Sequence, residues 1–102
     1  MYLVFDVKAP RAQIDQLLGS VTDPRADVVT RQSIMIREGR ALGFPDHGNL
    51  VVIEGTEAGL AAATELFKDV GAKLDGPRAE AVYRAIRAQE DDAASGLGLI
   101  FG

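Results

Sequence analysis

The sequence predicts one α+β domain with the element order β-α-β-β-α-β, followed by a further helix. Two observations indicate this class. Short segments rich in β-branched and aromatic residues alternate with longer segments in which apolar residues recur every three or four positions. Glycine, proline and asparagine separate these segments. The 102 residues suffice for one hydrophobic core, and no linker divides them.

The first half of the chain contains two predicted strands with a helix between them. Residues 2–8 (YLVFDVK) have strand composition, and Pro10 then begins a helix with aliphatic residues at helical spacing. We expect this helix to end at Gly19, in the left-handed conformation. After a turn at residues 22–24, the β-branched segment 27–38 predicts a long second strand.

The second half begins with a loop over residues 39–49, where glycine, proline, aspartate and asparagine are dense. Residues 50–55 predict a third strand, and Thr56 is a natural N-cap for a helix that ends at Gly71. A short strand over 72–75 and a third helix ending at Gly96 follow. The apolar stripes of the two helices consist of Leu60, Ala63, Phe67 and Val70, and of Ala79, Val82, Tyr83 and Ile86.

This order of elements is that of the ferredoxin-like, or split βαβ, fold with an added helix. Right-handed crossovers would place the first and third strands at the centre of an antiparallel sheet. We expect residues 1–102 to form a single domain, with residues 93–102 as a C-terminal arm. The arm contains four large apolar residues that need a dry surface, in the domain itself, on a neighbouring subunit or on a different protein: Leu97, Leu99, Ile100 and Phe101.

Composition and charge exclude several classes of function. The net charge is −4, with the acidic excess in the second half, which disfavours nucleic acid as a partner. No apolar run reaches the roughly 18 residues of a membrane span, so we expect no membrane partner and a cytoplasmic location. The absence of cysteine and the single histidine disfavour the common metal sites, and no cofactor motif is present. Successive helical residues diverge by about 100°, so the acidic run 90–92 cannot converge on one cation.

Strand alternation divides the predicted sheet into two faces. One face, expected to meet the helices, carries Leu3, Phe5, Val7, Ile34, Ile36, Val51 and Ile53. The opposite face is half apolar and carries Tyr2, Val4, Met35, Leu50 and Val52. A bare sheet face of this kind predicts self-association. Arg31 and Arg37 on that face could bind an oxyanion, or Arg31 could pair with Glu54 across the strands.

The loop over residues 39–49 is the predicted functional segment, because it is longer than a hairpin turn requires. It holds the only histidine, His47, next to Asp46 and close to Arg40 and Phe44. These residues could bind an anionic ligand beneath an apolar cover, with His47 as general acid or base oriented by Asp46 or another carboxylate. In the structural alternative, Phe44 and Leu42 pack on the core or on a partner subunit, while Asp46 and His47 make local turn hydrogen bonds.

The sequence therefore predicts a non-catalytic, self-associating module, such as an accessory or ligand-sensing subunit. The alternative is a small cofactor-free enzyme that acts on an anionic small molecule through His47. The candidate ligand-binding residues are Arg31, Arg37, Arg40, Phe44 and His47. The candidate self-association residues are Tyr2, Val4, Met35, Leu50, Val52, Leu99, Ile100 and Phe101.

Overall fold

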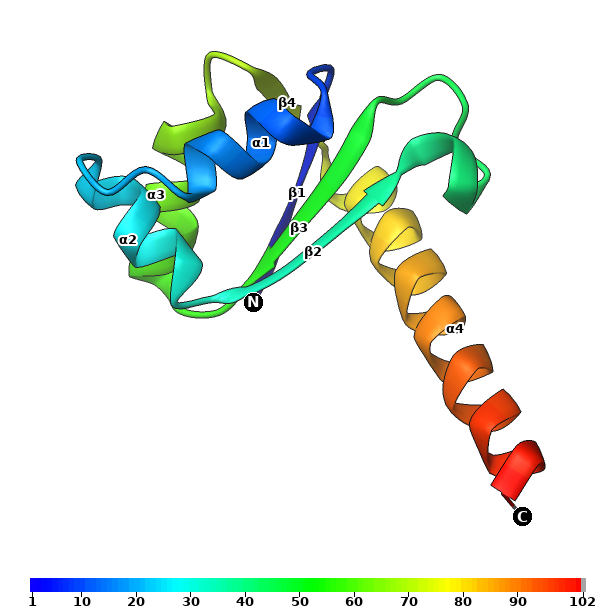
Figure 1. The fold of residues 1–102 in the computed structure, drawn as a ribbon. Coiled ribbons are helices and arrows are strands. Elements are labelled where there is room, and N and C mark those ends of the chain that lie inside the picture. Colours follow the sequence, from blue (N-terminus) through cyan, green and yellow to red (C-terminus); the bar gives the residue numbers. More distant parts are fainter. Residues whose placement is uncertain (102) are drawn as a thin grey trace.

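The computed structural model describes the backbone of residues 1–101 and the side chains of residues 1–91. Figure 1 shows a sheet with short helices on one side and a long helix on the other. The elements are β1 (Tyr2–Val7), α1 (Arg11–Leu18), α2 (Pro24–Thr30), β2 (Ser33–Glu38), the 3₁₀ helix η1 (Gly39–Leu42), β3 (Asn49–Glu54), α3 (Glu57–Phe67), β4 (Gly71–Lys73) and α4 (Gly76–Phe101). None of the described helices is long and apolar enough to cross a membrane.

The four strands form one antiparallel sheet in the order β2-β3-β1-β4. In the register of the central pair, Tyr2 lies opposite Glu54 and Val7 opposite Asn49. The predicted α+β class and the central positions of the first and third strands are confirmed.

The face of the sheet that packs on α1, α2 and α3 is the one that strand alternation predicted. Its strand residues join a core that includes Ile14 of α1, Val29 of α2 and Phe67 of α3, all fully buried. The rings of Phe5 and Phe67 lie 5.3 Å apart between their centroids. Thr56 caps α3 as predicted, because its side chain accepts a hydrogen bond from the Gly59 N–H at 3.1 Å.

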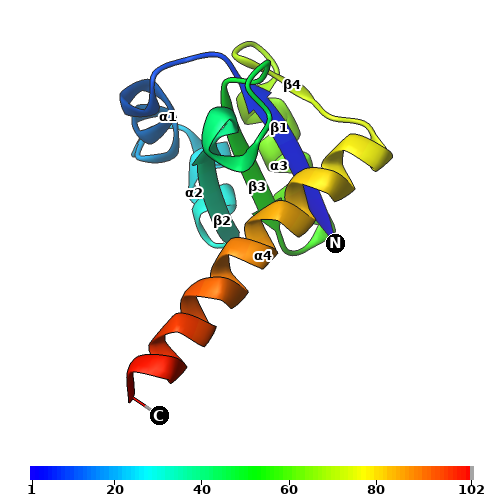
Figure 2. The same cartoon turned by 90° about the vertical axis from the view of Figure 1, so that its right-hand side faces the viewer.

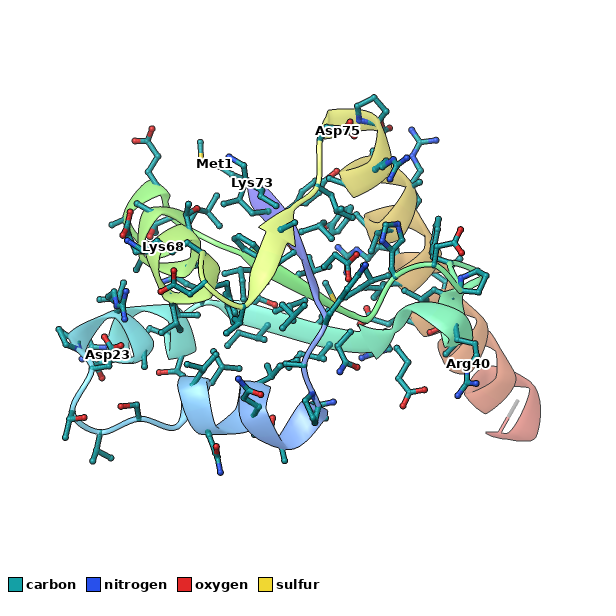
Figure 3. The ribbon with its side chains drawn as sticks, turned by 90° about the horizontal axis from the view of Figure 1, so that it is seen from above. Met1, Asp23, Arg40, Lys68, Lys73 and Asp75 are labelled. Atoms are coloured by element: carbon teal, nitrogen blue, oxygen red, sulfur yellow. The ribbon has the colours of Figure 1, made fainter. Side chains whose placement is uncertain are left out.

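The opposite face is not bare, which corrects the prediction of an open sheet. Val4, Leu50 and Val52 are fully buried under Val82 and Ile86 of α4. Figure 2 shows α4 crossing this face, and Figure 3 shows side chains filling the space on both sides of the sheet. The alternation of strand residues identified an apolar sheet face that must be buried, but a helix of the same chain buries it.

Tyr2 and Met35, also expected at an interface between copies, are partly buried in the same cluster. The ring of Tyr2 stacks on Tyr83 of α4 at 4.1 Å between centroids. These contacts remove the argument for self-association from the sheet, and self-association stays a prediction.

The predicted long strand over residues 27–38 is wrong in its first part, where α2 lies instead. The Asp23 side chain accepts a hydrogen bond from the Arg25 N–H at 2.9 Å, and Pro24 occupies the first helical position. Burial of Val29 against the core stabilises the helix against the β-propensity of its branched residues. The Asp-Pro pair, interpreted from sequence as a turn, was the helix signal.

Three predicted glycine roles are also corrected. Gly71, expected to end the helix that Thr56 caps, is the first residue of β4, because α3 ends at Phe67. Gly19 ends α1 with a φ of −87°, so it is not left-handed; Gly43, with a φ of 87°, takes that conformation. Helix α4 does not end at Gly96 but continues to Phe101. A glycine in a helix costs only about 1 kcal/mol relative to alanine and does not by itself end it. The side chains of Leu99, Ile100 and Phe101 lie outside the described residues.

The packing of α4 on the sheet predicts the effect of an Ile86→Ala substitution. Ile86 is fully buried, so its truncation should lower the free energy of unfolding by about 2 to 4 kcal/mol. Chemical denaturation at two protein concentrations measures this. An equal loss at both concentrations is expected for cover within one chain, whereas a concentration-dependent loss would contradict it. The exposed neighbour Ala88, changed to Ser, serves as control.

A side-chain hydrogen bond between α4 and β3, from Tyr83 to Glu54, is expected to respond to alkaline pH. The Tyr83 hydroxyl donates to a Glu54 carboxylate oxygen at 2.9 Å, and this bond, followed by burial and the Glu54 charge, raises the pKa of Tyr83. Its contribution to stability is complete below the unfolded-state pKa of about 10 and is lost as pH rises through the higher folded-state value. Stability should therefore fall more steeply above pH 10 in the wild type than in Tyr83→Phe, as measured by urea unfolding at stepped pH. Equal slopes would contradict this.

Candidate functional site

The loop between β2 and β3 is a closed and well-bonded structure. The Gly39 N–H donates to the Gly48 carbonyl oxygen and the Phe44 N–H to the Gly39 carbonyl oxygen, each at 2.8 Å. A Cβ atom at Gly39 would lie 2.6 Å from the Phe44 carbonyl oxygen, so only glycine fits. Leu42 and Phe44 pack against the cluster under α4. The predicted packing of Phe44 on the core is therefore confirmed.

His47 is held by Asp6 of β1. The Nδ1 atom of His47 lies 2.6 Å from one carboxylate oxygen of Asp6, and the Gly48 N–H donates to the other at 2.8 Å. The side chains of His47 and Asp6 are only 15% and 9% exposed. The orienting carboxylate is therefore Asp6, 41 positions earlier in the chain, rather than the adjacent Asp46. With Nδ1 bonded to Asp6, Nε2 is the ring nitrogen left for another partner.

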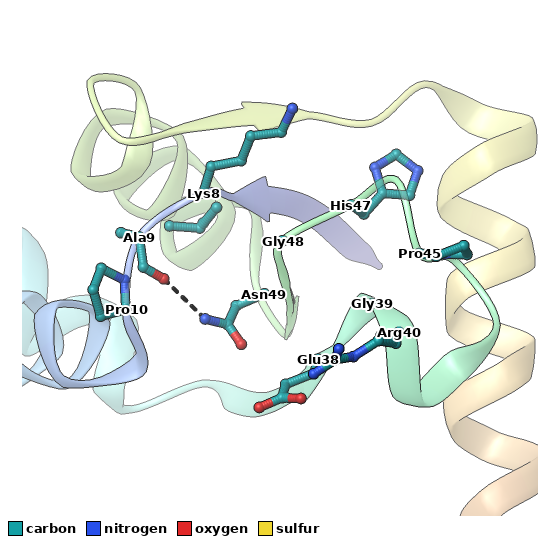
Figure 4. Close-up of a pocket in the computed structure, with 11 residues that line it drawn as sticks. Lys8, Ala9, Pro10, Glu38, Gly39, Arg40, Pro45, His47, Gly48 and Asn49 are labelled. Atoms are coloured by element: carbon teal, nitrogen blue, oxygen red, sulfur yellow. Dashed lines mark hydrogen bonds between the residues drawn. The ribbon is translucent and has the colours of Figure 1, made fainter.

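A polar pocket of about 430 Å³ opens where the segment after β1 meets the ends of the β2–β3 loop. Figure 4 shows Asn49 in this pocket, where its side-chain amide donates to the Ala9 carbonyl oxygen at 2.9 Å. Three residues with nitrogen-containing basic side chains line the pocket: Lys8, Arg40 and His47. We call this cavity the polar pocket.

The polar pocket has a local excess of positive charge in an acidic protein. Lys8 and Arg40 are exposed, and within residues 1–91 neither has a carboxylate oxygen within 4.0 Å. Glu38 is the acidic side chain that also lines the pocket. Pro10, another lining residue, precedes α1, whose first turn has neither a side-chain cap nor an acidic residue. Backbone N–H groups at such a helix start favour negative charge.

A second cavity of about 380 Å³ lies on the other side of His47, between the loop and the start of α4. Its walls are more apolar and include Phe44, Pro77 and Val82, with Arg78 at the edge. We call it the apolar pocket. His47 and Pro45 border both cavities.

The structure brings together only part of the predicted ligand set. Arg40 and His47 line the polar pocket, whereas Phe44 and His47 line the apolar one. Arg31 ends α2 and pairs with Asp27 at 3.2 Å rather than with Glu54. Arg37 lies on β2, where it donates to the Ile36 carbonyl oxygen at 2.9 Å and has a Glu90 oxygen at 4.0 Å.

Sequence reasoning missed two residues of the site, Asp6 and Lys8. The signal for Asp6 was a charged residue inside an otherwise apolar strand, because a buried carboxylate needs partners. Lys8 had no comparable signal, since it lines the same pocket as Arg40 only because β1 pairs with β3. Asp46 lines the apolar pocket and is exposed.

Comparison with protein-family models, with curated proteins and with solved structures gives no match. Within residues 1–91, no three histidine or acidic side chains lie close enough to hold a metal ion. The geometry of the loop is therefore the basis on which a function can be argued.

The Asp6–His47 contact can be measured by a double-mutant cycle. Asp6→Asn, His47→Gln and the double variant should show a coupling energy of about 1 to 3 kcal/mol in the free energy of unfolding, because the pair is buried and hydrogen-bonded. Asp46→Asn, which changes the adjacent exposed carboxylate, should shift stability by less than about 0.5 kcal/mol. A coupling energy near zero would contradict the contact.

Proposed function

We propose that this chain is a non-catalytic module that binds a small anionic ligand in the polar pocket. The observation that carries the proposal is the meeting of Lys8, Arg40 and His47 around one cavity. Neither Lys8 nor Arg40 is paired with a carboxylate of residues 1–91, in a chain with a net charge of −4. An unpaired cation pair flanking a cavity attracts a carboxylate or phosphate.

The dimensions and polarity of the polar pocket support a small ligand. A volume of about 430 Å³ lies in the range of about 300 to 1,000 Å³ for small-molecule sites. The Arg40 guanidinium offers paired donors that match an oxyanion, and the Lys8 ammonium adds a point charge. Pro10, which lines the pocket, precedes the uncapped start of α1, whose N–H groups also favour negative charge. Each of these groups favours an anion over a cation.

The hydrogen bonds of the Asp6 carboxylate support ligand binding, rather than catalysis, as the main proposal. Both carboxylate oxygens of Asp6 are engaged, one by the His47 ring and one by the Gly48 N–H. This arrangement fixes the loop that forms one wall of the pocket. A fixed wall reduces the entropy lost when a ligand binds.

A second candidate function, acid–base catalysis on an anionic small molecule, is favoured by the same pair. A carboxylate that holds one imidazole nitrogen orients the other toward a substrate. Arg40 would then hold the substrate anion beside His47.

We also propose that the fold is of the ferredoxin-like type. Its support is the antiparallel sheet with β1 and β3 at the centre, together with helical connections from β1 to β2 and from β3 to β4. The extra α2 in the first connection and the long α4 are additions to that arrangement.

Titration with small anions tests the proposed function. Inorganic phosphate, citrate and acetate are added in turn to the isotope-labelled protein, and amide shifts are followed by NMR. Binding should perturb residues 8–10, 39–40 and 47–49. Lys8→Gln and Arg40→Gln should each weaken binding at least 5-fold, whereas Arg31→Gln, which removes an equal charge outside the pocket, should weaken it less than 2-fold.

Three outcomes distinguish the candidates. Loss of affinity in the pocket variants alone supports a binding module. Equal losses in the Arg31→Gln control would indicate general charge attraction and contradict the site. If the wild type converts an added anion chemically, and His47→Gln loses this conversion but keeps its affinity for the anion, the protein is an enzyme and not only a binding module.

A further inference from the structure

Helix α4 carries one apolar stripe that is longer than the sheet it covers. Three residues of its first half that pack on the sheet recur 18 positions later as large apolar residues: Ala79 as Leu97, Val82 as Ile100 and Tyr83 as Phe101. At 3.6 residues per turn, 18 positions are about five turns, so each pair occupies the same register on the helix. Between them, Ala93 follows Ile86 by seven positions, about two turns.

The second half of α4 extends beyond the domain. Figures 1 and 2, at right angles to each other, both show the helix leaving the sheet and continuing alone to its C-terminal end. Helical rise puts Phe101 about 22 Å beyond Ile86, which among the side chains of residues 1–91 is the last of α4 in the buried cluster. The continuous helix carries the second half of the stripe away from this chain's own sheet.

We infer that this distal stripe, defined as Ala93, Leu97, Ile100 and Phe101, pairs with the distal stripe of a second copy, with the two helices antiparallel. With a two-fold axis at Leu97 the stripe is self-complementary, since Ala93 of each copy then lies near Phe101 of the other. The interface is independent of the polar pocket and of the sheet, so it goes beyond the proposed function.

Charge selects the antiparallel orientation. The acidic run Glu90, Asp91 and Asp92 immediately precedes the stripe. In a parallel pair the two runs would lie side by side, about 8 to 10 Å apart. In an antiparallel pair centred on Leu97 they are separated by about 18 Å along the axis, because Asp91 lies six residues from the centre in each copy. That separation exceeds the Debye length of about 8 Å, so repulsion is screened.

Engineered cysteines give a direct test, because the natural chain has none. Under mild oxidation, Leu97→Cys should form a disulfide-linked dimer at least 10-fold faster than Leu99→Cys, which lies in the same segment but about 160° away from Leu97 around the helix. Ala93→Cys should also be slow, because its two copies lie about 12 Å apart along the axis. Equally fast Ala93→Cys and Leu97→Cys cross-linking would overturn the antiparallel orientation.

The molecular mass of the protein in solution provides a second test. Light scattering over a concentration series should show wild type and Leu99→Asp dimerising alike, and Leu97→Asp remaining monomeric. Circular dichroism reports whether Leu97→Asp keeps the wild-type helix content of the domain. A wild type that stays monomeric at millimolar concentration, or equal effects of the two substitutions, would overturn the inference.

Discussion

The rest of the structure depends on a sheet that is apolar on both faces. Phe5 and Val51 are buried on one side, and Val4 and Val52 on the other, so the chain must supply two covering layers. Three short helices form the first layer, and α4 forms the main part of the second. The position of α4 in turn gives the β2–β3 loop a surface to pack on: Leu42 and Phe44 join its cluster, and the Gln89 side chain donates to the Ala41 carbonyl oxygen at 3.3 Å.

The candidate site follows from the same constraint. Asp6 points to the α4 side of β1, where it is 8% exposed, and a carboxylate in such surroundings requires hydrogen-bond donors. His47 and Gly48 supply them from the neighbouring loop. Through its contacts with Asp6 the loop is fixed to the central strand, and both pockets border that fixed segment. The strand β1 therefore determines both the packing of the second layer and the geometry of the site. Its apolar residue Val4 packs under α4, and its single acidic residue, Asp6, holds the loop.

Local patterns in the sequence predicted the strands, the two sheet faces and the Thr56 cap, because period-two alternation and capping depend on neighbours along the chain. They failed where a distant segment decides. The β-branched residues 28–30 are helical because the helix that they continue buries Val29 against core residues of distant elements, such as Phe67 of α3. The apolar face around Val52 indicated a partner, and nothing local indicated that α4 would cover it. Likewise His47 was identified, but its partner Asp6 could be found only once the strands were paired.

His47 lines two cavities of different character and so forms part of the wall of both. A wall shared in this way makes the occupancies of the two cavities thermodynamically reciprocal. If a molecule in the apolar pocket moves the ring and changes the affinity of the polar pocket by some factor, an anion in the polar pocket must change the affinity of the apolar one by the same factor. The hydrogen bond to Asp6 restrains the position of His47, so it also restrains any coupling that passes through this residue.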